Sequence, residues 1–315
     1  MKGKDLLSVS DLSHDDVLSL ISEASDMKSN GDWISLLDGK IIALVFEKPS
    51  LRTRVSFEVA MRQLGGQSIY LSPSEIGLDK REPTSDVAQV LTRYVDAIVA
   101  RTFSHRTLEI MADYAGIPVI NALSDLEHPC QALADLLTIY EKKGEFDGLT
   151  VAYVGDGNNV AHSLLLAASL VGMNVRLASP PGYTVSERIL QLASEYAEEN
   201  DAEIVCTDEP SVAVAGADVV YTDVWTSMGQ EAEAEERRKI FANYQVNGEL
   251  LALAKEDAIL MHPLPAHYGE EVAEGVLDSL QSVVFDQAEN RLHVQKALLA
   301  QILGGLGLPQ TGYRR

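Results

Sequence analysis

The feature that most constrains the fold is a regular alternation of short apolar runs with longer amphipathic segments. The apolar runs have the length and composition of buried strands, and the segments between them show helical spacing of their apolar residues. Strands that alternate with helices form crossover units, which place the strands parallel in one sheet. The runs fall into two series, so we predict an α/β fold with two parallel-sheet, three-layer domains joined by interdomain helices.

The predicted elements can be placed along the chain. Strands are predicted at Ile41–Phe46, Ser68–Leu71, Ala97–Ala100 and Pro118–Ile120 in the first series, and at Val151–Val154, Val175–Ala178, Ile204–Cys206, Val219–Tyr221, Ile259–Met261 and Val283–Phe285 in the second. Helices are predicted at Arg52–Leu64, Ser85–Tyr94, Thr107–Tyr114, Val160–Val171 and Ser186–Glu199.

These series define two predicted domains, one over residues 1–140 and the other over residues 145–290. The segment from His128 to Lys143 is helical in pattern and is followed by Gly144, a common signal for the end of a helix. We therefore expect it to join the two domains. The last helix, about 293–315, is expected to pack back on the first domain.

The composition excludes several classes of function. The formal charge is −22, from 25 basic and 47 acidic residues, which argues against binding to nucleic acid or to anionic membranes. No apolar run reaches the roughly 18 residues of a membrane-spanning helix, and the N-terminal apolar stretch is too short for a signal peptide. The two cysteines, Cys130 and Cys206, are too few for a disulfide framework.

We therefore predict a cytoplasmic protein. Its acidic residues are dispersed along the chain, which suits a high-salt cytoplasm because screening there removes their mutual repulsion. An acidic mesophilic protein is the alternative.

The loop after the first strong strand has the chemistry of an anion site. It reads Phe46-Glu47-Lys48-Pro49-Ser50-Leu51-Arg52-Thr53-Arg54 and leads into a predicted helix. A helix N-terminus that carries hydroxyls and arginines suits phosphate. The alternative is a serine N-cap followed by a solvated first turn, but basic residues in a first turn oppose the helix dipole.

This loop resembles the carbamoyl-phosphate motif Ser-x-Arg-Thr-Arg of the aspartate and ornithine carbamoyltransferases, and the Phe-Glu-Lys-Pro before it is typical of the ornithine branch. The resemblance implies that Ser50, Leu51 (through its backbone), Arg52 and Thr53 hold the phosphate. The family usually has Thr at the position of Leu51, so one hydroxyl contact can be lost here.

Two further motifs match the family. Arg101 and His105 stand in Val-x-Arg-x-x-x-His, whose arginine the family uses on carbamoyl phosphate. The segment His128-Pro129-Cys130-Gln131 resembles His-Pro-x-Gln, which implies that His128 donates to the carbonyl oxygen of carbamoyl phosphate and that Gln131 contacts its amide. A donor at that oxygen makes physical sense, because negative charge grows there as an amine attacks. Without these neighbours, His128 would be taken for a structural histidine.

Motifs in the second half concern the acceptor substrate. Asp223 follows an apolar strand, where a carboxylate can pair with an amino group; alone, it would be taken for a solvated turn residue. The pattern Asp-x-x-x-Ser-Met-Gly, with Asp223, Ser227 and Met228, resembles the ornithine-binding loop, which aspartate carbamoyltransferases lack. The segment Gly155–Asn159 resembles a family segment whose last Asn contacts the ornithine backbone, which implies that role for Asn159.

A dinucleotide site is the alternative interpretation of the glycines at 155 and 157. The third glycine of that fingerprint is missing, and no acidic residue clearly ends the next strand. We therefore do not expect NAD.

The segment His262-Pro263-Leu264-Pro265 contains the main departure from the ornithine branch. Most of its members have His-Cys-Leu-Pro, and Pro263 replaces that cysteine, as in the aspartate enzymes. The carbonyls of Pro263 and Leu264 can still accept from the carbamoyl NH2. Downstream, Glu289-Asn290-Arg291 resembles a family motif whose arginine reaches the carbamoyl carbonyl, which implies that role for Arg291.

No metal or organic cofactor is expected, because no group of His, Cys and carboxylate residues has ligand spacing. The family also borrows a Gln or Lys from a neighbouring subunit's loop. The matching stretch here, Glu75–Pro83, has no Gln, which leaves Lys80 or Arg81 as candidates. The resemblance thus implies a homo-oligomer, either a trimer or a multiple of trimers.

The resemblance covers essentially the whole chain and implies transfer of the carbamoyl group of carbamoyl phosphate to the δ-amine of L-ornithine, as part of arginine metabolism. The catalytic residues would be Arg101, His128 and Arg291. An aspartate enzyme is favoured by Pro263 but opposed by the Ser-Met-Gly loop. A putrescine enzyme would not need Asn159 and Ser227 to hold an amino-acid head group. A catalytically silent scaffold is opposed by the intact phosphate motif.

Overall fold

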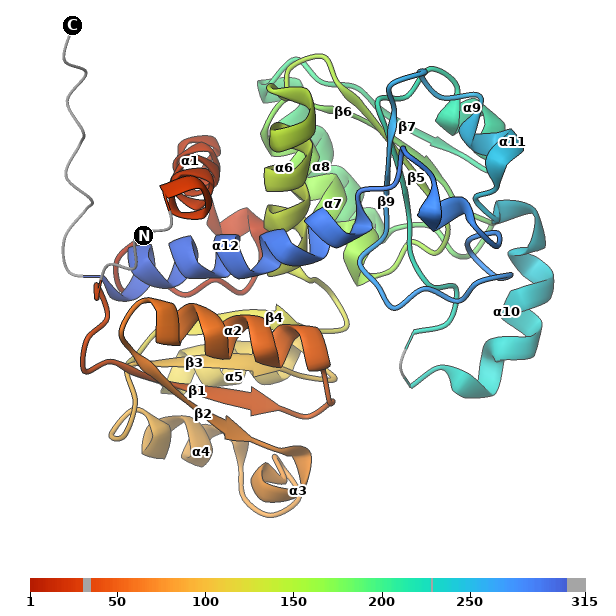
Figure 1. The fold of residues 1–315 in the computed structure, drawn as a ribbon. Coiled ribbons are helices and arrows are strands. Elements are labelled where there is room, and N and C mark those ends of the chain that lie inside the picture. The colour runs from red at the N-terminus through yellow and green to blue at the C-terminus, as the bar shows by residue number, and fades with distance from the viewer. Residues whose placement is uncertain (31–34, 228, 305–315) are drawn as a thin grey trace, which may run out of the picture. The chain divides into compact units, whose positions relative to one another are not determined.

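The structure is a computed structural model that describes residues 1–30, 35–227 and 229–304. The chain divides into two compact units (Figure 1). Unit 1 comprises Met1–Asp125 together with the chain from Arg291 onward, and unit 2 comprises Leu126–Asn290. Among the described residues, no helix is both long enough and apolar enough to cross a membrane.

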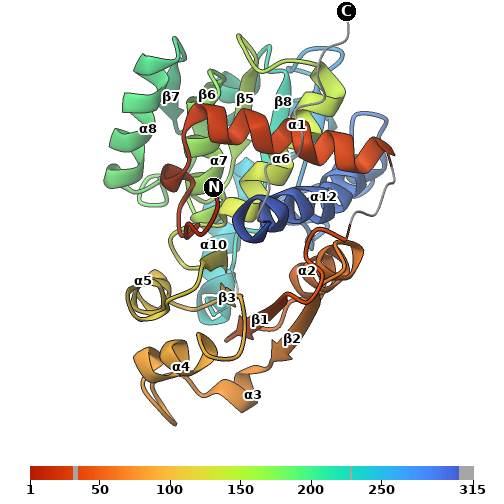
Figure 2. The ribbon, with the colours of Figure 1, turned by 90° about the vertical axis from the view of Figure 1, so that its left-hand side faces the viewer.

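Unit 1 is built on a four-stranded parallel sheet in the order β2-β1-β3-β4. Its strands are β1 (Ile41–Phe46), β2 (Gln67–Leu71), β3 (Ala97–Arg101) and β4 (Val119–Leu123). Its shorter helices are η1 (Val9–Asp11), α1 (His14–Asn30), α2 (Leu51–Gln63), α3 (Pro73–Ile76), α4 (Thr84–Leu91) and α5 (His105–Tyr114). Figures 1 and 2 show α2 on one face of this sheet and α4 and α5 on the other. Val45 and Ile98 pack with Leu108 and Met111 in the core of the second face.

Unit 2 is built on a five-stranded parallel sheet in the order β7-β6-β5-β8-β9. Its strands are β5 (Thr150–Val154), β6 (Asn174–Ala178), β7 (Ile204–Thr207), β8 (Val219–Thr222) and β9 (Ile259–Met261). Its helices include α6 (Pro129–Lys143), α7 (Asn159–Leu170), α8 (Glu187–Glu199), α9 (Pro210–Val214), η2 (Glu231–Glu233), α10 (Ala234–Ile240), η3 (Ala242–Tyr244), α11 (Gly248–Leu251) and η4 (Val276–Asp278). Val154 and Val220 pack with Trp225, Phe241 and Val246.

The strand orders confirm the prediction of two parallel-sheet α/β domains. In each sheet the chain reverses its direction of progress at a central strand: β1 lies between β2 and β3, and β5 lies between β6 and β8. The loops that follow such a pair of strands diverge and leave a crevice, which is where ligands bind in open parallel sheets. In unit 1 this position brings together the loops after β1 and β3, and in unit 2 the loops after β5 and β8.

One predicted strand is wrong. Val283–Phe285 does not form a strand, because helix α12 (Val284–Leu303) begins within it. The chain makes a single bridge between Ser282 and Leu260 beside β9 and then turns into the helix. A three-residue apolar run does not distinguish the end of an extended segment from the first turn of a buried helix.

Helix α12 runs on from unit 2 into unit 1 at Arg291. Within unit 1 its later turns contact α1. The Lys296 ammonium donates to the Met27 carbonyl at 3.5 Å, and the Gln301 amide donates to Glu23 at 2.8 Å. These contacts fix the part of the helix that follows Arg291.

Candidate active site

The phosphate motif of unit 1 forms the beginning of α2. Ser50 is the N-cap, and its hydroxyl accepts from the Thr53 backbone N–H at 3.4 Å and donates to the Thr53 hydroxyl at 3.0 Å. Thr53 is fully buried, whereas the Leu51 side chain is 76% exposed. At Leu51, therefore, the group available to an anion is the backbone N–H at the start of the helix rather than the apolar side chain.

Three arginines belong to this part of unit 1. Arg52 lies in the first turn of α2, Arg101 ends β3, and Arg291 lies on α12. The Arg291 guanidinium donates to the Thr53 hydroxyl at 2.6 Å. Burial, followed by the charges of Arg291 and Arg52, lowers the pKa of Arg101 to about 10. Guanidinium groups that repel one another in a partly buried setting favour an anion that neutralises them.

His128 and Gln131 stand at the beginning of α6 in unit 2. His128 is the N-cap residue, and its backbone N–H donates to the Ser163 hydroxyl at 2.9 Å. That hydroxyl in turn donates to Glu127 at 3.1 Å, which holds the loop before the helix. Gln131 lies one turn further on, is buried, and donates through its amide to Asp135 at 2.8 Å. The His128 backbone and the Gln131 side chain are thus held by buried contacts.

Asp223 lies just beyond the end of β8 and is nearly buried. Its carboxylate accepts from the Asn158 amide at 2.8 Å, and burial raises its pKa above the usual value for an aspartate. Asn158 also caps α7, because its oxygen accepts from the N–H groups of Val160 and Ala161. The half-buried Asn159 is the first residue of that helix. The hydrogen bond between the Asn158 amide and the Asp223 carboxylate therefore links the loops that follow β5 and β8.

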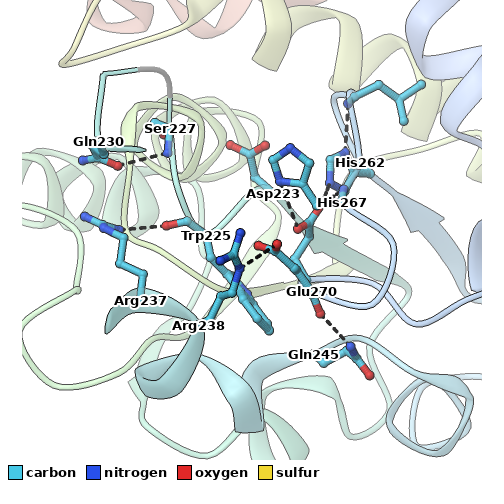
Figure 3. A network of polar contacts seen from close by, with 12 residues as sticks. Asp223, Trp225, Ser227, Gln230, Arg237, Arg238, Gln245, His262, His267 and Glu270 are labelled. Atoms are coloured by element: carbon cyan, nitrogen blue, oxygen red, sulfur yellow. Dashed lines mark hydrogen bonds and ion pairs between the residues drawn. The ribbon is translucent and has the colours of Figure 1, made fainter. Parts of the chain in front are cut away.

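The loop after Asp223 is held from one side by Arg237 of α10 (Figure 3). The buried Arg237 donates to the Trp225 carbonyl and to Asp156, both at 2.9 Å, and to Glu233 at 3.1 Å. The Ser227 backbone N–H donates to the Gln230 side chain at 3.0 Å. The predicted ornithine-binding residue Met228 lies outside the described residues.

The second glycine of the loop after β5 has a packing role. A Cβ atom at Gly157 would lie 2.2 Å from the Val185 backbone nitrogen. The loop therefore needs glycine there to approach the backbone at 184–185. This contact explains the second glycine without a dinucleotide ligand.

The segment after β9 is anchored through His262. The His262 Nδ1 atom accepts from the Leu264 N–H at 2.9 Å, so the ring carries its proton on Nε2 and donates from there to Glu271 at 3.0 Å. Glu271 also accepts from the His267 N–H at 2.6 Å. Leu264 has a φ of 54°, in the left-handed region that a leucine rarely adopts. The fully buried His262 and Glu271 thus hold this loop, with the buried Pro263, in one conformation.

The same loop brings together three possible metal ligands that the sequence analysis did not single out. Ligand atoms of His267, Glu270 and Glu271 lie within 4.8 Å of one another. Glu270 is paired with Arg238 at 2.8 Å (Figure 3), and Glu271 accepts from His262 and His267. These contacts account for the cluster as a polar network. In the sequence, the only indication of this cluster was the spacing His-x-x-Glu-Glu over residues 267–271.

Several residues of these networks were missed by sequence reasoning. Asn158 contacts Asp223, and Asp156 pairs with Arg237. Burial raises the pKa of Asp156 to about 6, an effect that Arg237 partly offsets. Asp135 could have been suspected, because it follows Gln131 at the spacing of one helical turn. For Arg237, far along the chain from its partner, the sequence carried no signal.

Comparisons with known proteins place the chain in a family. Residues 4–141 match the model of the aspartate/ornithine carbamoyltransferase carbamoyl-P binding domain, and residues 147–302 match that of the Asp/Orn binding domain. Together they span almost the whole chain. The protein belongs to the aspartate/ornithine carbamoyltransferase family.

Within that family its similarity is to the ornithine enzymes. The ornithine carbamoyltransferase of Anoxybacillus flavithermus is 54% identical over 306 residues, covering 96% of this chain and 98% of that protein. That of Hyperthermus butylicus is 56% identical over 306 residues, covering 96% of this chain and 98% of the relative. The solved ornithine carbamoyltransferase of Pyrococcus furiosus is 52% identical and superposes with a TM-score of 0.94, covering 97% of this chain and 99% of that one.

Proposed function

We propose that the protein transfers the carbamoyl group of carbamoyl phosphate to the δ-amine of L-ornithine, forming L-citrulline and phosphate. The observation that carries the proposal is the arginine group of unit 1, in which Arg291 contacts Thr53 and the charges of Arg52 and Arg291 act on Arg101. Such a group suits a phosphate that arrives with the substrate and leaves as product. The names of the relatives supply the acceptor, ornithine.

We assign the parts of the reaction to residues as follows. Carbamoyl phosphate is bound by Ser50, Leu51, Arg52, Thr53, Arg101, His128, Gln131, Pro263, Leu264 and Arg291. Ornithine is bound by Asn159, Asp223, Ser227 and Met228. Unit 1 is thereby assigned to carbamoyl phosphate and unit 2 mainly to ornithine. No metal or organic cofactor enters the proposed reaction.

The proposed chemistry is a direct attack. The neutral δ-amine forms a bond to the carbamoyl carbon, the C–O bond to phosphate breaks, and the amine gives up a proton. His128 and the arginines stabilise the charge that grows on the carbonyl oxygen and on the leaving phosphate. Because only the deprotonated amine attacks, the rate should rise with pH over the alkaline range. A flat profile there would contradict this step.

Further features of the proposal rest on resemblance and on charge. We propose a trimer or a multiple of trimers, in which Lys80 or Arg81 completes a neighbour's site. We also propose that the protein works in a cytoplasm of high salt concentration; the net charge of −22 supports this proposal. Size measurement in low and molar salt, together with activity at each, tests both points.

The experiment that tests the function is a comparison of acceptors. Purified protein is mixed with carbamoyl phosphate and with ornithine, aspartate or putrescine in parallel, and the carbamoylated product is identified. We expect citrulline from ornithine and no product from the other two amines. Product from aspartate would show that Pro263 was the better guide to the acceptor than the Ser-Met-Gly loop. Silence with all three, from a folded oligomer, would favour a scaffold.

A further inference from the structure

A continuous chain of buried polar groups runs through unit 2 behind Gln131. The His262 backbone N–H donates to the Gln287 side-chain oxygen at 2.8 Å, and the Gln287 NH2 group donates to Asp135 Oδ1 at 2.7 Å. The Gln131 NH2 group donates to the same Asp135 oxygen at 2.8 Å. The Tyr221 hydroxyl donates to the other one at 3.0 Å. All four side chains are at most 1% exposed.

The direction of each hydrogen bond in this series follows from the first bond, in which the His262 backbone N–H donates to Gln287. A backbone N–H can only donate, so the Gln287 oxygen must face His262 and its NH2 group must face Asp135. Asp135 Oδ1 therefore acts as an acceptor. The Gln131 amide must then also turn its NH2 group toward Asp135.

This direction leaves the Gln131 oxygen pointing away from Asp135. That oxygen is buried and has no hydrogen-bond partner among the residues that the structure describes. A buried acceptor without a donor is unfavourable, so the arrangement suits a ligand that brings an N–H group. Carbamoyl phosphate carries one on its NH2 group. Acetyl phosphate has nearly the same shape but has a methyl group there and offers no donor.

We infer that Asp135, held by Gln287, fixes the direction of the Gln131 amide so that its oxygen accepts from the substrate NH2, which makes Asp135 a positioning residue for the selection of carbamoyl over acyl phosphates. The inference rests on the proposed function, because it takes carbamoyl phosphate to be the substrate. Gln287 also holds the backbone of His262. The two residues that follow His262, Pro263 and Leu264, are those whose carbonyls we assign to the same NH2 group.

The test compares the affinities for carbamoyl phosphate, acetyl phosphate and inorganic phosphate in citrulline-forming assays, the last two as competitive inhibitors. In Asp135→Leu the acceptor is gone and the Gln131 amide can turn. We expect affinity for carbamoyl phosphate to fall about ten- to hundredfold. Affinities for acetyl phosphate and inorganic phosphate should stay within about twofold, because neither ligand needs the Gln131 oxygen. A general loosening of the site would weaken all three.

Two further variants give the test its controls. Asp135→Asn can keep an oxygen toward Gln131 and Gln287 while its NH2 group donates to the Tyr221 hydroxyl, so it should preserve the preference for carbamoyl phosphate. Thr138→Val, further along α6, removes the hydroxyl that accepts from the Asn290 amide at 3.0 Å. It should leave all three affinities unchanged.

If Asp135→Leu does not fold, Gln131→Met removes the amide while leaving Asp135 in place, and it should abolish the same preference. Retention of the preference in folded Asp135→Leu, or in Gln131→Met where the former is not folded, overturns the inference. A wild-type protein that forms citrulline but binds carbamoyl phosphate and acetyl phosphate with equal affinity also overturns the inference, while the proposed function is unaffected. A wild-type protein that forms no citrulline overturns the function itself.

Discussion

The crevice loops of the two units have the same position on a parallel sheet and opposite charge. In unit 1 guanidinium groups stand at the end of β3 (Arg101) and at the start of the helix that follows β1 (Arg52). Burial, followed by the charges of the neighbouring arginines, lowers the pKa of Arg101 to about 10. In unit 2 the loops after β5 and β8 carry carboxylates, and burial raises the pKa of Asp156 to about 6 and that of Asp223 above its usual value.

This difference shows how one architecture can serve two kinds of ligand. In both units the charged residues stand at a reversal point of a parallel sheet, and burial disfavours their charged forms, although Arg237 partly offsets this effect for Asp156. Under the proposed function each group would gain from a ligand of the opposite sign, a phosphate in unit 1 and an amino group in unit 2. The side chains at the strand ends, rather than the fold, decide which ligand binds.

The largest effect is expected when the cationic group of unit 1 is broken. Arg101→Met should raise the KM for carbamoyl phosphate about a hundredfold, because charge-assisted hydrogen bonds are lost. It should also abolish the rise in melting temperature that inorganic phosphate causes. The ligand-free protein should not be destabilised, since two arginines are relieved of a repelling charge.

The matched control for Arg101 is Arg106→Met on α5, an exposed arginine paired with Glu109. It should change neither quantity. If Arg101→Met keeps its stabilisation by phosphate, the anion site does not depend on this group.

The carboxylate group of unit 2 should give a smaller effect on the other substrate. Asp223→Asn keeps the size of the side chain and removes its charge, so the KM for ornithine should rise about thirtyfold while affinity for carbamoyl phosphate is unchanged. Steady-state kinetics with each substrate varied in turn measures both. Asp257→Asn, an exposed aspartate paired with Lys143, serves as control. An equal loss of both affinities would contradict the separation of roles.

The buried acid of unit 2 should also appear in the pH dependence of stability. The folded-state pKa of Asp156, about 6, lies above its ordinary value of 3.8. Its contribution to stability is therefore fully present below pH 3.8 and is lost as pH rises through 6. The free energy of unfolding of the wild type, relative to Asp156→Asn, should fall by roughly 1 kcal/mol between pH 5 and pH 7.

Urea unfolding at the two pH values measures this difference. Glu233→Gln removes a more exposed partner of the same Arg237 but keeps Asp156. The difference in free energy of unfolding between the wild type and this variant should therefore not fall in the same way between the two pH values. A difference that stays constant from pH 5 to pH 7 would mean that Arg237 dominates and that the carboxyl is ionised throughout.

The smallest effect is expected at Leu51, where the family usually has threonine. Because the side chain is 76% exposed, Leu51→Thr should change the free energy of unfolding by less than about 0.5 kcal/mol. The KM for carbamoyl phosphate should fall by no more than about threefold if the hydroxyl adds a contact. Val55→Thr, one turn further along α2 and also exposed, is the control. A large change at Leu51 would mean that its side chain takes part in binding.

Much of this protein is determined by local sequence. The alternation of apolar and amphipathic segments predicted both parallel sheets, because each strand and helix has its own periodicity. The residues that follow the strands were visible as motifs, from Ser50 and Arg52 to Asp223, since each lies in the short segment after an apolar run. The apolar run at Val283–Phe285 was wrongly predicted as a strand, because three residues are too few to distinguish the periodicity of a strand from that of a helix.

The tertiary structure decided what depends on residues far apart in the sequence. The strand order sets which loops are neighbours, and the folded chain brings Arg237 onto Asp156 and Gln287 onto Asp135. No periodicity encodes such pairs, because they form only when buried polar groups must find partners across the folded unit. The direction of the Gln131 amide is of this kind: it is set by a backbone N–H of His262, at the far end of a chain of buried hydrogen bonds.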